Sequence, residues 1–220
     1  MNKLKTKIVV IASIVCILAI SIAGNTIAYF TDVKSTENTF TYGTGVKIRL
    51  TEQVESGNYT VTSPGQVLEQ NPTITNEGDG EVYVAGIITL KSDTVFLSDK
   101  VSVGDEQGKL NIMKFFSCGA FAEDQTDFNV KATTNGTDTF TVYIVYKQKV
   151  AINESVELFD GILVPASWDY PEMKYMQALT VTINAYATQT VGFANADEAI
   201  NGAFGGGADS TNGDFTGYFN

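Results

Sequence analysis

The chain has 220 residues, with 25 acidic and 14 basic side chains, no histidine and two cysteines. A formal charge of −11 at pH 7 argues against nucleic acid and anionic membrane surfaces as partners. The lack of histidine excludes a His-Glu-x-x-His zinc helix and any Ser-His-Asp or Cys-His catalytic arrangement. The sequence therefore predicts a protein that is not an enzyme and uses no cofactor.

The N-terminus has the layout of an export signal. The first seven residues hold three lysines and no acid, and an uncharged apolar run follows from Ile8 to about Gly24. This run is slightly long for the core of a signal and slightly short for a membrane span of about 20 residues. Small residues favour cleavage between Ala28 and Tyr29, so residues 1–28 are predicted to be a signal peptide. The alternative is an uncleaved anchor, which would be the only predicted contact with a membrane.

Cleavage leaves 192 residues, enough for one domain with its own hydrophobic core. The formal charge of this mature chain is −14, from 25 acidic and 11 basic residues. Any self-assembly must overcome that charge and should depend on salt. Cys118 would be the only remaining thiol, so no disulfide can form within one chain. We interpret it as a small buried residue, with a nucleophile or an intermolecular bridge as the alternative.

Alternating apolar residues predict strands through most of the chain, starting at Val46–Leu50. In Glu81–Lys91 both alternating faces are apolar, which places this strand in the centre of a sheet. Thr139–Val150 and Leu179–Ala187 continue the pattern with β-branched and aromatic residues. Weaker candidates are Tyr59–Thr62, Pro72–Asn76, Leu110–Phe116, Phe128–Thr133 and Val156–Val164.

Short strands separated by turn residues predict the fold class. Ser63-Pro64-Gly65, Asn76–Gly80, Asn135-Gly136 and Asn153-Glu154 all favour turns. We expect an all-β, jelly-roll-like antiparallel β-sandwich with one short C-terminal helix, spanning residues 43–204.

The expected helix begins near Asn195, a good N-cap, and runs toward Phe204. The glycines at 205–207 end it. Residues 205–220 are rich in Gly, Asp, Ser, Thr and Asn, so they predict a flexible tail. The alternative is that the aromatic end of the tail docks on a neighbouring molecule.

Several short motifs in the first 84 residues occur together and in a definite order. They are Ala28-Tyr29-Phe30-Thr31-Asp32, Asn38-Thr39-Phe40, a Gly-containing step into Val46-Lys47-Ile48, Pro64-Gly65, Asn71–Gly78 and Tyr83-Val84. In this respect the chain resembles the TasA/camelysin family.

The resemblance implies a signal processed by a SipW-type signal peptidase. It also implies a secreted jelly-roll subunit of extracellular biofilm-matrix filaments, joined head to tail as a homopolymer. In such fibres the mature N-terminal segment of one subunit pairs with the sheets of the next.

Residues 29–42 support this implication physically, because they read as an extended arm that follows directly from the processed end. Their apolar side chains are the candidate subunit contacts Tyr29, Phe30, Val33, Phe40 and Tyr42. A free strand can supply backbone partners to an open sheet edge, and head-to-tail repetition then gives a filament. The alternative is that the arm forms the first strand of its own domain.

Other side chains suggest weaker sites. Glu77, Asp79 and Glu81 are weak candidates for calcium, although their spacing is not that of an EF-hand. Trp168 is either a sugar-stacking platform or a core residue at the end of the sandwich. A monomeric cell-surface adhesin or carbohydrate-binding sandwich is therefore the alternative function. Some family members have been described as zinc proteases, but a camelysin-like secreted protease is disfavoured here by the missing histidines.

Overall fold

The computed structural model describes residues 45–52, 61–117, 119–122, 126–207, 210 and 212–219, and the backbone of residues 31–35. The predicted cleavage site at Ala28 and Tyr29, the arm residues Phe30, Phe40 and Tyr42, and Cys118 lie outside the described residues.

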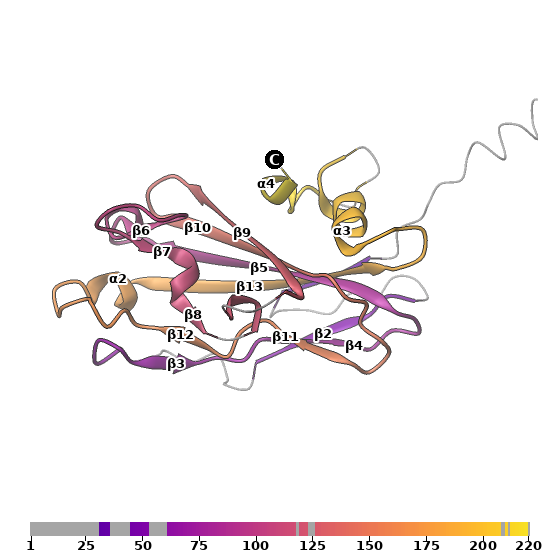
Figure 1. The fold of residues 1–220 in the computed structure, drawn as a ribbon, viewed down its shortest axis with the longest axis horizontal. Helices are drawn as coiled ribbons and strands as arrows, with labels where there is room; N and C mark the ends of the chain where they lie inside the picture. The colour runs from indigo at the N-terminus through magenta and orange to yellow at the C-terminus, as the bar shows by residue number, and fades with distance from the viewer. Residues whose placement is uncertain are drawn as a thin grey trace, which may run out of the picture.

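The protein is an antiparallel β-sandwich of two layers (Figure 1). The first layer is a five-stranded sheet in the order β1-β13-β5-β10-β9. Its strands are β1 (Thr31–Ser35), β13 (Leu179–Gln189), β5 (Val82–Ser92), β10 (Thr139–Tyr146) and β9 (Phe128–Asn135). The prediction of an all-β antiparallel sandwich is confirmed.

The second layer consists of two three-stranded ladders, β11-β4-β2 and β3-β12-β8. Their strands are β2 (Ile48–Thr51), β3 (Val67–Glu69), β4 (Thr73–Asn76), β8 (Phe116–Ser117), β11 (Ser155–Glu157) and β12 (Gly161–Leu163). Between the ladders, Leu158 N donates to Pro72 O at 2.9 Å and Gln70 N donates to Asp160 O at 3.2 Å. The β3–β4 and β11–β12 segments therefore run alongside each other as one interrupted pair.

The strong strand predictions match the structure, whereas three of the weaker ones differ from it. Val61 and Thr62, the described part of Tyr59–Thr62, form no strand, and Val156–Val164 is divided into β11 and β12, which belong to different ladders. Leu110–Phe116 is mostly the 3-10 helix η2 (Ile112–Phe115), flanked by β7 (Leu110–Asn111) and β8. The Asn111 side chain accepts a hydrogen bond from Met113 N at 3.0 Å and so caps a helical turn. In addition, β6 (Val101–Ser102) pairs with β7 in parallel, and three short helical segments lie in the loops: η1 (Leu97–Asp99), η3 (Gly119–Phe121) and α2 (Lys174–Gln177).

The main core lies between the layers. Apolar side chains from both sheets fill it, and Ile48, Ile74, Ile88 and Ile144 are fully buried there. Trp168 also belongs to this core, at 6 % exposure, with its ring 5.8 Å from that of Phe115 in an edge-to-face contact. The core interpretation of Trp168 is therefore correct, and the residue is not accessible as a sugar-stacking platform.

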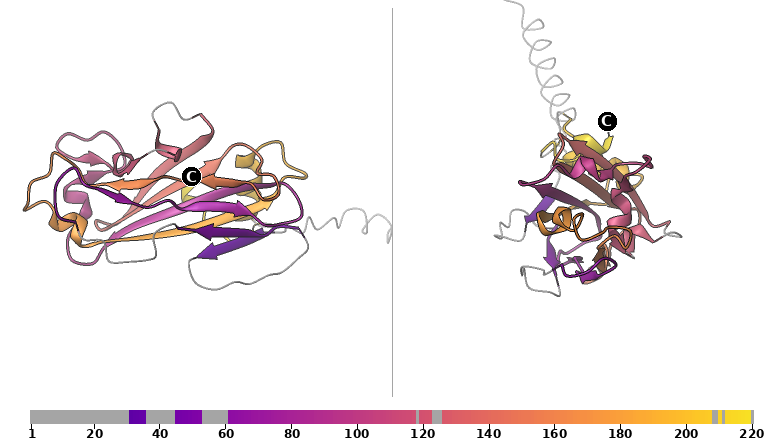
Figure 2. Two further views of the ribbon diagram at one scale, coloured as in Figure 1. Left: turned by 90° about the horizontal axis from the view of Figure 1, so that it is seen from below. Right: turned by 90° about the vertical axis from the view of Figure 1, so that its left-hand side faces the viewer.

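The outer face of the five-stranded sheet carries a second apolar cluster, which explains why β5 is apolar on both faces. Helix α3 (Ala196–Phe204) lies over this face, on the side opposite the second layer (Figures 1 and 2). Its N-cap is Asn195, as predicted: Asn195 Oδ1 accepts from Glu198 N at 2.9 Å. No helix among the described residues is long and apolar enough to cross a membrane.

The end of the chain differs from the flexible tail that the sequence predicts. Phe215 is 0 % exposed, and its ring centroid lies 5.1 Å from that of Tyr186 and 5.6 Å from that of Tyr143. Helix α4 (Thr216–Phe219) follows it, and Gly217 sits so close to the sheet that a Cβ there would lie 2.4 Å from Tyr143 Oη. The burial of the Phe215 side chain thus outweighs the tendency of this polar segment to remain flexible.

Candidate subunit-contact site

The described part of the predicted arm is β1, which pairs antiparallel with β13 at the edge of the five-stranded sheet. The register places Thr31 opposite Thr188, Val33 opposite Tyr186 and Ser35 opposite Asn184. Within this single chain, part of the arm therefore forms a strand of its own domain, which is the alternative considered from the sequence. Of the predicted contact residues, Val33 is the one whose backbone the structure places.

In the part of the chain that the structure describes, β1 covers only part of the β13 edge. β13 has 11 residues, and β1 pairs with five of them, from Asn184 to Thr188. Among the described residues, no strand pairs with Leu179–Ile183 on that side. Thr180 and Thr182 in this half are exposed. An uncovered edge presents backbone N–H and C=O groups that another strand can pair with.

β13 is nevertheless an integral part of the core. Ala185 and Ala187 are fully buried in the main core, and Tyr186 is buried in the outer cluster. Thr188 is also fully buried, and its Oγ1 has no hydrogen-bond partner in the described part of the chain. If β1 left the sheet, the backbone N–H and C=O groups of β13 beside these buried side chains would lose their partners. This loss favours the binding of another strand in the place of β1.

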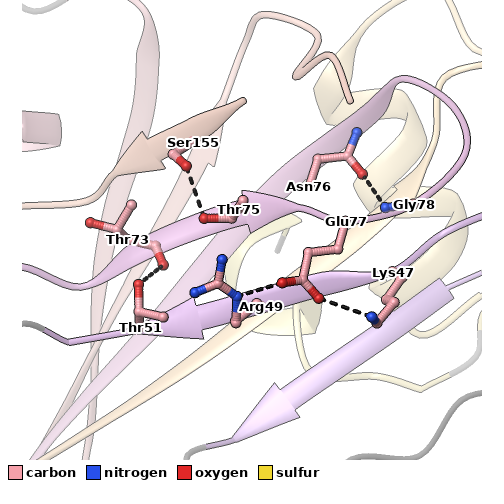
Figure 3. Close-up of polar contacts among 9 residues, drawn as sticks. All are labelled: Lys47, Arg49, Thr51, Thr73, Thr75, Asn76, Glu77, Gly78 and Ser155. Carbon is pink, nitrogen blue, oxygen red and sulfur yellow. Dashed lines mark hydrogen bonds and ion pairs between the residues drawn. The ribbon is translucent and has the colours of Figure 1, made fainter. Parts of the chain in front are cut away.

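Strand β2 lies at the neighbouring edge of the second layer and contacts both β1 and β13. Glu77 anchors this edge: Arg49 Nε donates to Glu77 Oε1 at 2.5 Å, and Lys47 Nζ lies 3.0 Å from Glu77 Oε2 (Figure 3). Hydrogen bonds from Arg49 and Lys47, in that order of importance, lower the pKa of the Glu77 carboxyl. Glu77 is thus paired with cationic side chains.

The three weak calcium candidates do not come together. Glu77 pairs with Lys47 and Arg49, whereas Glu81 lies 3.6 Å from Lys149 Nζ. Asp79 takes part in the turn, where its backbone N donates to Gly45 O at 3.2 Å. Among the described residues, no group of three or more Asp, Glu, Cys or His side chains could hold a metal ion.

A buried asparagine fixes the turn that carries Glu77. Asn76 is fully buried; its Nδ2 donates to Gly80 O at 2.8 Å and to Val150 O at 3.0 Å. Its Oδ1 accepts from Gly78 N at 2.9 Å (Figure 3). This side chain therefore joins the β4–β5 turn to the segment before β11, and no sequence pattern singled it out beyond marking a turn.

Together, the fold and the edge define the chain as a β-sandwich protein whose first described strand, β1, pairs with five of the 11 residues of β13 at the sheet edge. The chain belongs to the camelysin metallo-endopeptidase family, whose model matches residues 3–139. The family resemblance inferred from the N-terminal motifs is therefore confirmed. No curated protein and no solved structure matches the chain.

The family description names a metal-dependent enzyme, but the residues of this chain do not fit a catalytic zinc site. Such sites use three protein ligands, most often including histidine, and leave one position open for water. The whole chain has no histidine, and its described carboxylates do not gather into a group of three.

Proposed function

We propose that the chain is an exported, non-enzymatic structural subunit that assembles head to tail into extracellular filaments of a biofilm matrix. In this proposal the N-terminal strand of one subunit pairs with β13 of the next. The main support is the half-covered edge of β13: five of its 11 residues have a described partner there.

The position of β1 in the chain also favours exchange. β1 is joined to β2 by residues 36–47, a stretch of 12 residues that can span about 40 Å when extended. β1 can therefore leave its own sheet without breaking β2 away from β4. Pairing of β1 with β13 of a second copy would restore the same backbone hydrogen bonds, so few contacts are lost when the strands exchange. The extent of exchange should therefore depend mainly on protein concentration.

The charge of the mature chain predicts how assembly responds to salt. Subunits of formal charge −14 repel each other, and salt screens this repulsion within a Debye length of about 8–10 Å. Fibre formation should therefore be slow at low ionic strength and faster at physiological ionic strength.

The decisive experiment uses a disulfide across the β1–β13 pair. Thr31 and Thr188 are directly opposite, so cysteines at these positions lie within reach of one another. The mature chain is prepared as T31C/T188C with Cys118→Ser, and the C118S chain alone is the matched control. Oxidation before assembly locks β1 in its own sheet, whereas oxidation after assembly links whichever chains are paired.

Strand exchange predicts that the locked protein forms no fibres by electron microscopy until it is reduced. Fibres that are oxidised after assembly should give a ladder of covalent oligomers on a non-reducing gel. If the locked protein assembles normally, or if the oxidised fibres contain only single chains, exchange through β1 is wrong. If the C118S chain forms no fibres at any salt concentration, the filament proposal itself fails.

A further inference from the structure

A hollow lies on the outer face of the second layer, where β3, β12 and β8 run side by side. This face points away from α3 and α4 (Figure 1). The hollow has a volume of about 420 Å³, and its walls are Val67, Glu69, Asn71, Ser117, Asp160 and Leu163. That volume is within the range of about 300–1,000 Å³ that is usual for small-molecule sites.

The register brings the residues of the hollow together across three strands. Glu69 on β3, Gly161 on β12 and Ser117 on β8 form one rung across the three strands. Gly161 contributes no side chain to the rung, and Val67 and Ser117 close over it. A Cβ at position 161 would lie 2.7 Å from Val67 Cγ1 and 3.1 Å from Ser117 Oγ. The Val67 and Ser117 side chains therefore occupy the space above Gly161, and the rung brings Glu69 and Ser117 to the same part of the hollow.

The polar groups of the hollow are rich in acceptors. Glu69 and Asp160 are acidic, and none of the described residues that line the hollow is basic. Ser117 Oγ donates to Asp160 Oδ1, so the serine proton is already used. The amide of Asn71 is engaged as well: its Nδ2 donates to Glu157 Oε2 at 3.0 Å, and its Oδ1 accepts from Thr73 Oγ1 at 2.7 Å. A ligand that fits this site must therefore supply donors and positive charge.

Two further observations narrow the class of ligand. Gln70, which also lines the hollow, is 8 % exposed, and its Oε1 has no hydrogen-bond partner in the described part of the chain. The hollow has two carboxylates, and among the described residues no group of three or more Asp, Glu, Cys or His side chains could hold a metal ion. An organic cation that also donates hydrogen bonds therefore fits the site better than a metal ion. Val67, at 48 % exposure, and Leu163 add an apolar wall against which C–H groups can pack.

We propose that this hollow binds an amino sugar unit of a polysaccharide. The ammonium group would lie between Glu69 and Asp160, sugar hydroxyls would donate to the remaining carboxylate oxygens, and a C–H face of the ring would pack on Val67 and Leu163. A neutral sugar lacks the charge, and an anionic sugar is repelled by both carboxylates. The site is separate from the β1–β13 edge and does not depend on strand exchange.

The test is isothermal titration calorimetry on the full mature chain, locked as T31C/T188C in the C118S background so that assembly does not interfere. The probes are a β-1,4-linked glucosamine tetramer, its fully N-acetylated form, and butylamine. We expect the glucosamine tetramer to bind, and the acetylated tetramer and butylamine to bind at least about tenfold more weakly, because each lacks either the charge or the hydroxyls.

Variants separate this site from general attraction to an acidic protein. Glu69→Gln should weaken glucosamine binding by about tenfold, the effect expected when a hydrogen bond to a charged group is lost, and Asp160→Asn should do the same. Asp93→Asn is the matched control, because it removes one exposed negative charge that pairs with Lys91 elsewhere on the protein. The proposal is overturned if Asp93→Asn weakens binding as much as Glu69→Gln. It is also overturned if the acetylated tetramer or butylamine binds as tightly as glucosamine, or if no probe binds.

Discussion

Phe215→Ala is the sharpest test of the packed C-terminal end. The Phe215 ring is fully buried among Tyr143, Tyr186 and Phe204, with centroid distances of 5.6, 5.1 and 6.2 Å. Truncation removes these contacts and leaves a cavity against the outer face of the five-stranded sheet. A buried Phe→Ala change costs about 3–5 kcal/mol when the surroundings do not collapse.

That cost has an upper limit set by the position of Phe215 near the end of the chain. α4 can detach without unfolding the sandwich, so the measured loss cannot exceed the free energy with which this segment docks. We therefore expect a loss of about 3 kcal/mol in the free energy of unfolding. We also expect faster hydrogen exchange at the Phe215 amide, which donates to Phe204 O at 2.9 Å.

The assay is urea denaturation of the mature chain, followed by tyrosine and tryptophan fluorescence. Tyr170→Ala is the matched aromatic control, because Tyr170 is 75 % exposed and its removal should change stability by less than about 0.5 kcal/mol. A loss below about 1 kcal/mol for Phe215→Ala, with unchanged exchange at its amide, would refute the conclusion that this segment belongs to the core.

Three further predictions concern the polar contacts. Asn76→Ala leaves Gly78 N and Val150 O without their side-chain partner in a buried site, so it should lower the free energy of unfolding by about 3 kcal/mol. Thr75→Ala is the control, because Thr75 is a half-buried neighbour and its truncation should cost much less stability. Urea denaturation of the two variants measures the difference. Because the folded pKa of Glu77 is below its ordinary value of 4.5, its contribution to stability is present above pH 4.5 and is lost as pH falls through the lowered pKa. In denaturation experiments at several pH values, the free energy of unfolding should therefore fall less steeply with decreasing pH in Glu77→Gln than in the unmodified chain. An equally steep fall in both proteins would contradict the ion pairs of Glu77 with Arg49 and Lys47. Burial, with a hydrogen bond to Asp214 Oδ2 at 2.8 Å, raises the pKa of Tyr186, so its contribution is complete below the ordinary tyrosine pKa of 10 and is lost as pH rises above it. Tyr186→Phe should flatten the stability loss above pH 10, and an absorbance titration should show one fewer late-ionising tyrosine than in the unmodified chain.

The candidate contact site could be predicted only in part. The apolar residues of the arm, Val33 among them, identify a segment suited to strand pairing. They do not indicate which strand it meets, because the alternation in Leu179–Ala187 shows which residues face the core and carries no information about the two edges of the strand. The pairing of Val33 with Tyr186 follows from the register between β1 and β13, and the part of the β13 edge that has no partner among the described residues follows from the length of that pairing.

The sequence by itself determined the local features of this protein: the strand character of Glu81–Lys91 and Thr139–Val150, the Asn195 cap and the family motifs before Val84. Each of these depends on a few neighbouring residues and on the two-residue or helical period that they create. Only the tertiary structure decided that Phe215 is buried, that Trp168 is in the core and that Glu77 pairs with Lys47 and Arg49. These outcomes depend on residues far apart in the sequence, such as Tyr143 beneath Phe215, and burial free energy is gained only when the fold brings such residues together.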